Sequence, residues 1–115
     1  MDIREQISAG KASMGIELGS TRIKAILIGE NPNEVIGMGS HEWENSLVEG
    51  LWSYSLDEVW EGIQNTFRDL QQNLEANHRV RVTKLSSIGI SAMMHGYMAF
   101  DENDELLVPF RTWRN

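Results

Sequence analysis

Glu17 and the turn that follows it carry the clearest chemistry in the first part of the chain. Glu17 stands in the apolar run 15–18, two residues before Gly19, and Ser20 and Thr21 complete the turn. A carboxylate in an apolar strand is costly unless it has a partner such as a metal ion. A turn made of glycine and two hydroxyl residues offers backbone N–H groups and hydroxyls to an anion. Together these residues predict a site for a metal-bound phosphate.

The composition limits the classes of partner. The formal net charge of −7 argues against nucleic acid or an anionic membrane as the main partner. A nucleotide remains compatible, because Mg²⁺ can bridge acidic residues and phosphates. The chain has no cysteine, which fits a reducing cytoplasm. Its apolar runs are shorter than the roughly 20 residues that span a bilayer.

Turn residues and hydrophobic spacing divide the chain into elements. Residues 2–9 form either a short helix or a disordered leader. Strands are expected at residues 13–18, 22–29, 34–43, 84–91 and 96–101, and residues 45–54 are expected to be a loop. The order is β-β-β-α-β with a further strand. The strand after the helix should join the sheet parallel to an earlier strand.

One long helix should cover this sheet. Ser55 and Glu58 form a capping box at its start, and the helix ends near residues 77–78. Apolar residues at spacings of three and four form a single stripe: Leu56, Val59, Trp60, Ile63, Phe67, Leu70 and Leu74. Trp60 lies on this stripe, so we expect it in the core.

Three segments carry a resemblance to known proteins. The hairpin 15–28 resembles the first phosphate-binding motif of the superfamily of sugar kinases, heat-shock chaperones and actin. The segment 88–101, which contains Met94-His95-Gly96, resembles the FGGY carbohydrate kinases in their xylulose-kinase-like branch. The segment 107–115 is similar to the Pro-x-x-x-Trp-x-Asp element of the same family.

The resemblance implies an α/β fold class. We expect a ribonuclease H-like (actin-like ATPase) half-domain with a mixed sheet of β-β-β-α-β order and further strands, incomplete by itself. Residues 13–115 would be the N-terminal part of the first FGGY kinase domain, and residues 1–12 an extension or short helix.

The resemblance also implies ATP-dependent phosphoryl transfer to a sugar hydroxyl, with xylulose or a related ketose as the first expectation. Gly19, Ser20 and Thr21 would face the terminal phosphates of ATP, and Glu17 would hold Mg²⁺. Met94 and His95 would help to seat the sugar, His95 through a sugar hydroxyl and Met94 as a packing wall.

The general base and the adenosine pocket lie beyond Asn115 in relatives. We therefore expect the 115 residues alone to be inactive and to self-associate through their uncovered sheet. His41 and His78 show no ligand spacing with His95, so no histidine metal site is expected. Arg22 and Lys24 are expected to face solvent, while Trp43 and Trp52 flank a loop that could border the sugar cleft.

Two positions depart from the family pattern, because Glu17 and Asn115 stand where most relatives have Asp. They leave open a non-catalytic ligand-binding or interaction module with the same fold. An ATPase like the chaperones and actin is a weaker alternative, because Met94-His95-Gly96 belongs to the sugar kinase pattern. The sequence alone does not name the sugar, and gluconate or another ketose also remains open.

Overall fold

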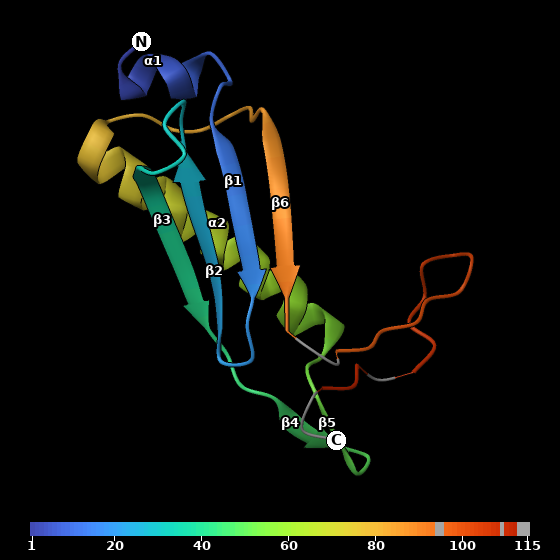
Figure 1. Ribbon diagram of the computed structural model, residues 1–115. Helices are drawn as coiled ribbons and strands as arrows, with labels where there is room; N and C mark the ends of the chain where they lie inside the picture. Colours follow the sequence, from blue (N-terminus) through green and yellow to red (C-terminus); the bar gives the residue numbers. More distant parts are fainter. Residues whose placement is uncertain (94–95, 109, 113–115) are drawn as a thin grey trace.

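A computed structural model describes residues 1–93, 96–108 and 110–112 of the chain. One mixed four-stranded sheet lies against one long helix, and a small hairpin lies beyond one end of the sheet (Figure 1). The elements are α1 (Ile3–Ser8), β1 (Ser13–Leu18), β2 (Arg22–Ile28), β3 (Val35–Glu42), β4 (Ser46–Val48), β5 (Leu51–Ser53), α2 (Leu56–His78) and β6 (Ser87–Ala92). The α/β class and the β-β-β-α-β order predicted from the sequence are therefore confirmed.

The strand order of the main sheet is β3-β2-β1-β6. β1, β2 and β3 form an antiparallel meander, and β6 returns parallel to β1 after α2, as expected. Successive strand residues point to opposite faces. Met14, Ile23, Ala25 and Leu27 are buried on the face toward α2, and they pack with residues of that helix.

α2 begins where the sequence predicts it. The Ser55 hydroxyl accepts a hydrogen bond of 3.1 Å from the Glu58 N–H, and Arg79 closes the helix in the left-handed conformation, with φ of 55°. The predicted stripe is only partly correct. Trp60 is 57% exposed, so its expected place in the core was wrong. The residues that α2 buries against the sheet include Gly62 and Thr66, which rotates the contact face away from Trp60.

Small residues on β3 explain this rotation. A Cβ atom added to Gly37 would lie 2.6 Å from Cδ2 of Leu74, and one added to Gly39 would overlap the Leu70 and Thr66 backbone of α2. β3 continues through both glycines. They let the helix backbone come close to the sheet.

Two predictions about irregular segments need correction. Residues 45–54 contain the hairpin β4–β5, whose turn residues Glu49 and Gly50 both have positive φ, 50° and 81°. This conformation suits a two-residue hairpin turn. Residues 96–101 do not form a strand, since only isolated bridges join Tyr97 to Arg111 and Phe100 to Leu106.

The N-terminal segment is a helix in the structure, rather than a disordered leader. The Asp2 carboxylate accepts a hydrogen bond of 2.8 Å from the Glu5 N–H and caps α1. Ile7 is fully buried in the core beside Leu27, and the Gln6 side chain accepts a hydrogen bond from the Glu30 N–H. α1 thus covers the end of the sheet farthest from the turn between β1 and β2 (Figure 1).

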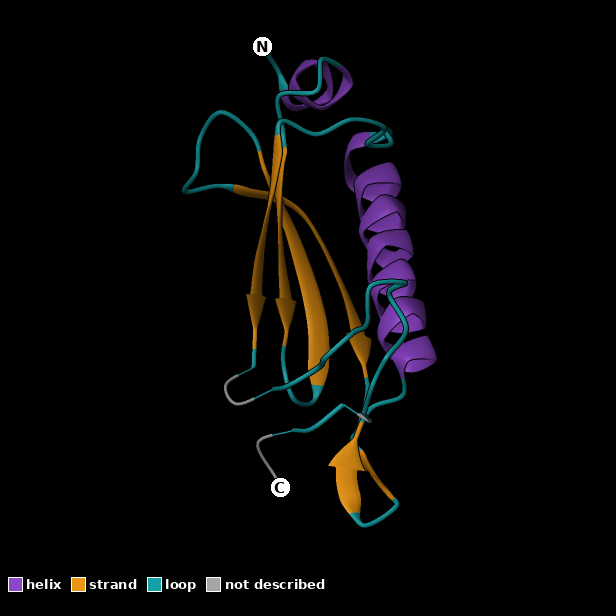
Figure 2. Ribbon diagram, turned by 90° about the vertical axis from the view of Figure 1, so that its right-hand side faces the viewer, coloured by secondary structure: helices purple, strands orange, loops and turns teal. Residues whose placement is uncertain are grey.

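The two faces and the two edges of the sheet differ. α2 lies along one face, and in the described ranges no helix lies on the other (Figure 2). At the β3 edge, Asn73 and Asp69 of α2 accept hydrogen bonds from the N–H groups of Met38 and Ser40, at 3.1 and 2.9 Å. At the opposite edge, all six residues of β6 are exposed. Among the described residues, neither helix is long and apolar enough to cross a membrane.

Candidate functional site

The turn between β1 and β2 is built by Gly19, Ser20 and Thr21. The Gly19 N–H donates a hydrogen bond of 2.9 Å to the Arg22 carbonyl, which closes the hairpin. In the part of the chain that the structure describes, the N–H groups of Ser20 and Thr21 donate no hydrogen bond. Thr21 is exposed and Ser20 is half-buried. The turn therefore presents two unengaged N–H groups and two hydroxyls, which are the groups that an anion needs.

The carbonyl groups of the same turn are all engaged by two aromatic residues. The indole N–H of Trp43 donates to the Gly19 carbonyl at 2.8 Å, and the Trp43 backbone N–H donates to the Thr21 carbonyl at 3.1 Å. The Tyr54 hydroxyl donates to the Ser20 carbonyl. Three consecutive carbonyls of the turn are thus held by one aromatic pair.

Glu17 lies beside this turn and is exposed. It points to the sheet face opposite α2, because its neighbours Ile16 and Leu18 pack into the core on the other face. A Cβ atom added to Gly19 would lie 3.6 Å from Oε1 of Glu17, so the carboxylate is close to the turn. The expectation that this carboxylate is enclosed in an apolar strand was wrong. Because Glu17 is exposed, its carboxylate does not by itself require a metal partner.

A shallow hollow of about 450 Å³ opens on this sheet face around Glu17. Lys24 lies opposite Glu17 on β2, and Ser91 lies beside it on β6. Gly15 and Gly89 line the floor of the hollow, where an added Cβ on Gly89 would meet no atom within 4 Å. The hollow therefore combines one carboxylate, one ammonium, small residues and the apolar residues Ile16, Ile26 and Ile90.

The arrangement can hold Mg²⁺ only when phosphate supplies further ligands. Among the described residues, no group of three His, Asp or Glu side chains could hold a metal ion. Mg²⁺ is usually bound through one or two carboxylates together with substrate phosphates and water. Glu17 beside an anion-binding turn satisfies that requirement, and the donor set of this site is compatible with a metal–nucleotide complex.

Met94 and His95 lie outside the described residues, as does Asn115. The residues that flank the Met-His pair lie close to the turn. Met93 donates its N–H to the Leu18 carbonyl at 2.9 Å, and a Cβ atom added to Gly96 would lie 3.4 Å from Cζ of Phe110. A small apolar cavity of about 110 Å³ lies between these segments. Its lining includes Leu18, Trp43, Met93, Gly96, Tyr97 and Phe110.

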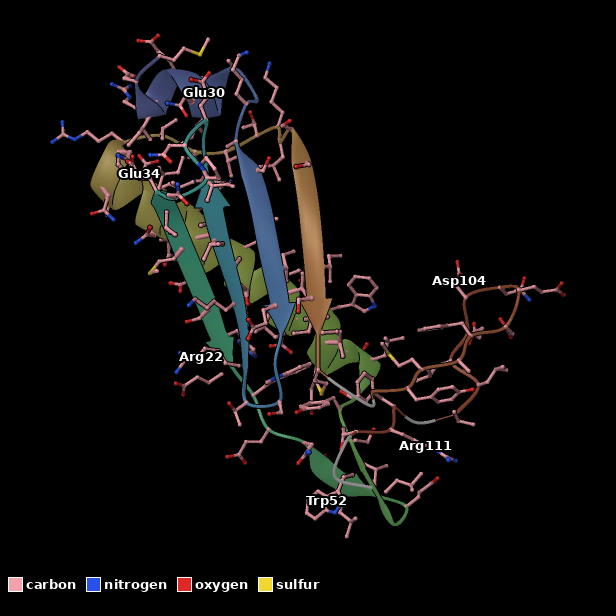
Figure 3. The ribbon with its side chains drawn as sticks, in the orientation of Figure 1. Arg22, Glu30, Glu34, Trp52, Asp104 and Arg111 are labelled. Atoms are coloured by element: carbon pink, nitrogen blue, oxygen red, sulfur yellow. The ribbon has the colours of Figure 1, made fainter. Side chains whose placement is uncertain are left out.

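The remaining candidate residues differ in their exposure to solvent. Arg22 and Lys24 are exposed, as expected, and Arg22 forms a 3.8 Å ion pair with Glu42. Figure 3 shows Arg22 near the turn end of the sheet and Trp52 in the small hairpin. Trp43 is buried behind the turn, and it lines the small apolar cavity.

Tyr54 is a site residue whose link to the turn the sequence did not indicate. It is 1% exposed, and burial raises the pKa of its phenol above the ordinary value of 10.0. No spacing rule links a tyrosine at position 54 to a turn at positions 19–21. Only the path of the chain through β3 and the β4–β5 hairpin brings them together.

The fold and the turn define a class, the sugar kinases with an actin-like ATPase fold. A xyloylose kinase from Brucella ovis has a similar structure, with a TM-score of 0.71 and 25% sequence identity over 89% of this chain and 21% of that one. A gluconate kinase from Lactobacillus acidophilus has the same fold, with a TM-score of 0.68 and 22% identity over 89% of this chain and 19% of that one.

Sequence comparison places the chain within this class. Residues 12–115 match the model of the FGGY family of carbohydrate kinases, N-terminal domain, and the chain belongs to that family. It is 32% identical over 105 residues to a gluconokinase from Bacillus subtilis, covering 87% of this chain and 18% of the relative. It is 30% identical over 102 residues to a xylulose kinase from Klebsiella pneumoniae, covering 89% of this chain and 20% of the relative. The chain therefore spans about a fifth of the length of these relatives.

Proposed function

We propose that this chain is the nucleotide-phosphate-binding part of an ATP-dependent sugar kinase, which transfers the terminal phosphate of ATP to a sugar hydroxyl. The observation that carries the proposal is the turn itself. Its carbonyls at Gly19, Ser20 and Thr21 are engaged, while the N–H groups of Ser20 and Thr21 are not, and Glu17 lies beside them. Membership of the FGGY family supports reading this turn as a phosphate site.

In this proposal, each residue of the turn has a role in positioning phosphate. The N–H groups and hydroxyls of Ser20 and Thr21 bind the terminal phosphates, and Gly19 permits the tight approach of the chain to the Arg22 carbonyl. Glu17 holds Mg²⁺ directly or through water. The metal, when bound, neutralises phosphate charge. Phosphoryl transfer depends mainly on such positioning and charge stabilisation.

We further propose that Met94 and His95 help to seat the sugar. Their neighbours Met93 and Gly96 lie beside the turn and the small apolar cavity. Xylulose or a related ketose remains the first candidate, and gluconate is the second. The relatives support both, because a xylulose kinase and gluconokinases match the chain at similar identity.

The 115 residues alone should not phosphorylate a sugar. The relatives are about five times longer. We place the general base and the adenosine pocket in chain beyond Asn115. We also infer a cytoplasmic location, which agrees with the absence of cysteine and with the need for ATP.

Two preparations test the proposal, the 115-residue chain and the longer protein encoded by the gene. Each is incubated with ATP, Mg²⁺ and one of a panel of sugars that includes xylulose, ribulose, gluconate and glycerol. We expect ADP and sugar phosphate only from the longer protein, with one ketose or gluconate strongly preferred. Sugar phosphorylation by the 115-residue chain would contradict the prediction that this chain alone is inactive. A longer protein that binds ligand without turnover would support the alternative, a non-catalytic module. Glu17, which stands where most relatives have Asp, is the observation that favours this alternative.

A further inference from the structure

We propose that Trp43 and Tyr54 are positioning residues, which hold the Gly19–Thr21 turn so that its N–H groups face the phosphates of the nucleotide. This inference rests on the proposed function for the identity of the anion. The orientation of the turn is a property of the chain by itself.

Peptide geometry is the first step of the argument. In a planar trans peptide, the C=O of one residue and the N–H of the next point in opposite directions. Trp43 binds the Gly19 carbonyl at 2.8 Å, so the N–H of Ser20 must point away from Trp43. Tyr54 binds the Ser20 carbonyl, so the N–H of Thr21 points away from Tyr54 in the same manner. The hydrogen bonds to the Gly19 and Ser20 carbonyls therefore fix the direction of the two N–H groups that the turn offers to an anion.

Packing of the aromatic pair makes this orientation rigid. The rings of Trp43 and Tyr54 are stacked, with centroids 4.0 Å apart and an interplanar angle of 24°. The side chains are 8% and 1% exposed. Phe110 packs edge-on against Tyr54, at 5.6 Å between centroids and 89° between planes. A buried and stacked ring has little freedom to turn, so its hydrogen-bonding group stays at one place.

The same pair reaches the segment that carries the Met-His motif. Phe110, which packs on Tyr54, also lies under Gly96, where an added Cβ would be 3.4 Å from its Cζ atom. Trp43 and Phe110 both line the 110 Å³ cavity beside that segment. Tyr54 thus connects the back of the phosphate turn with the chain that flanks the proposed sugar residues.

The test uses two conservative variants of the full-length protein. Tyr54→Phe removes one hydroxyl and keeps the stacked ring, and Trp43→Phe removes the indole N–H. Ser46→Ala, which removes an exposed hydroxyl in β4, and Trp60→Phe, at a side chain that is 57% exposed, are the controls. Steady-state kinetics with ATP and sugar would be combined with amide hydrogen exchange of the 19–22 segment, measured without nucleotide.

We expect kcat/KM for ATP to fall about fivefold in Tyr54→Phe and in Trp43→Phe, the effect of one net hydrogen bond. The sugar KM should stay within about a factor of two, and exchange of the Gly19 N–H, which is hydrogen-bonded to the Arg22 carbonyl, should accelerate several-fold. The controls should change neither quantity.

The outcomes separate this inference from the proposed function. If the wild-type protein neither binds ATP nor phosphorylates any sugar of the panel, the proposed function is wrong. If the wild-type protein is active and Tyr54→Phe and Trp43→Phe match the controls in kinetics and in exchange, the positioning role is wrong and the function stands.

Discussion

Gly39 of β3 lies directly against Leu70 of α2, with no room for a side chain between the two backbones. This contact allows the backbone of α2 to lie close to β3. A Gly39→Ala change should lower the free energy of unfolding by about 2–3 kcal/mol, the usual cost of overpacking, because the obstructing atoms belong to the helix backbone.

Urea unfolding followed by circular dichroism measures this loss. Gly89→Ala is the matched control, since its added Cβ meets no atom within 4 Å. It should be neutral or slightly stabilising, because alanine loses less conformational freedom than glycine on folding. Equal unfolding midpoints for the two variants would show that α2 can move away from β3 at little cost.

Gly19→Ala should weaken nucleotide binding. The added Cβ would lie 2.9 Å from the Arg22 carbonyl oxygen, so the turn must open to admit it. We expect the KM for ATP to rise roughly tenfold, which corresponds to about 1.4 kcal/mol. Gly10→Ala serves as the control, because Gly10 follows α1 at the opposite end of the sheet and the atoms nearest its added Cβ belong to the side chain of Lys84. Unchanged ATP kinetics in Gly19→Ala would argue against the turn as the phosphate site.

Glu17→Gln should raise the Mg²⁺ concentration for half-maximal activity by roughly tenfold, because the amide keeps the shape and loses the charge. Glu17→Asp should retain much of the metal response. Since Glu17 is exposed, unfolding free energy should change by less than about 0.5 kcal/mol. Glu34→Gln is the control, at the opposite end of the sheet (Figure 3). Identical Mg²⁺ titrations for wild type and Glu17→Gln would exclude the metal role.

Stability at high pH should report on Tyr54. Burial raises the pKa of its phenol above 10.0, so the folded state keeps this proton to higher pH than the unfolded chain does. The stabilisation is fully present below about pH 10 and is lost as pH rises through the folded-state pKa. Tyr54→Phe should therefore lose less stability than wild type between about pH 9 and pH 11. A Tyr54→Phe curve parallel to the wild-type curve would contradict the assignment.

The 115-residue chain studied alone should self-associate through β6. The strand has no charged residue, and Ile88 and Ile90 are 55% and 70% exposed. Its sequence Ser-Ile-Gly-Ile-Ser reads the same in both directions. Antiparallel pairing of two copies about Gly89 would place Ile88 of one copy opposite Ile90 of the other. Unpaired apolar edges of this kind favour strand-to-strand association.

Sedimentation velocity over a range of concentrations tests this association. Ile90→Lys should shift the chain toward monomer. Met38→Lys, at the edge where α2 side chains already bind the strand N–H groups, should have little effect. A wild-type chain that stays monomeric at high concentration would refute the prediction.

Local patterns in the sequence were sufficient for much of the fold. The apolar runs in residues 13–18 and 22–29, joined by a tight turn, predicted two strands, and Ser55 with Glu58 predicted the start of α2. These features depend on neighbours within a few residues, so the sequence displays them directly. The β4–β5 hairpin was missed because its strands have only three residues each.

By itself, the sequence determined the order of strands and helix in the main sheet and the family, and it predicted the Glu17–Thr21 segment as the place for phosphate chemistry. Only the tertiary structure decided that Glu17 is on the open face, that Trp60 is exposed, and that Trp43 and Tyr54 bind the carbonyls of the turn. The physical reason is the distance in sequence between the residues that interact. A strand or a cap arises from residues close in sequence, whereas the Ser20–Tyr54 hydrogen bond joins residues 34 positions apart and exists only after the sheet and α2 have packed.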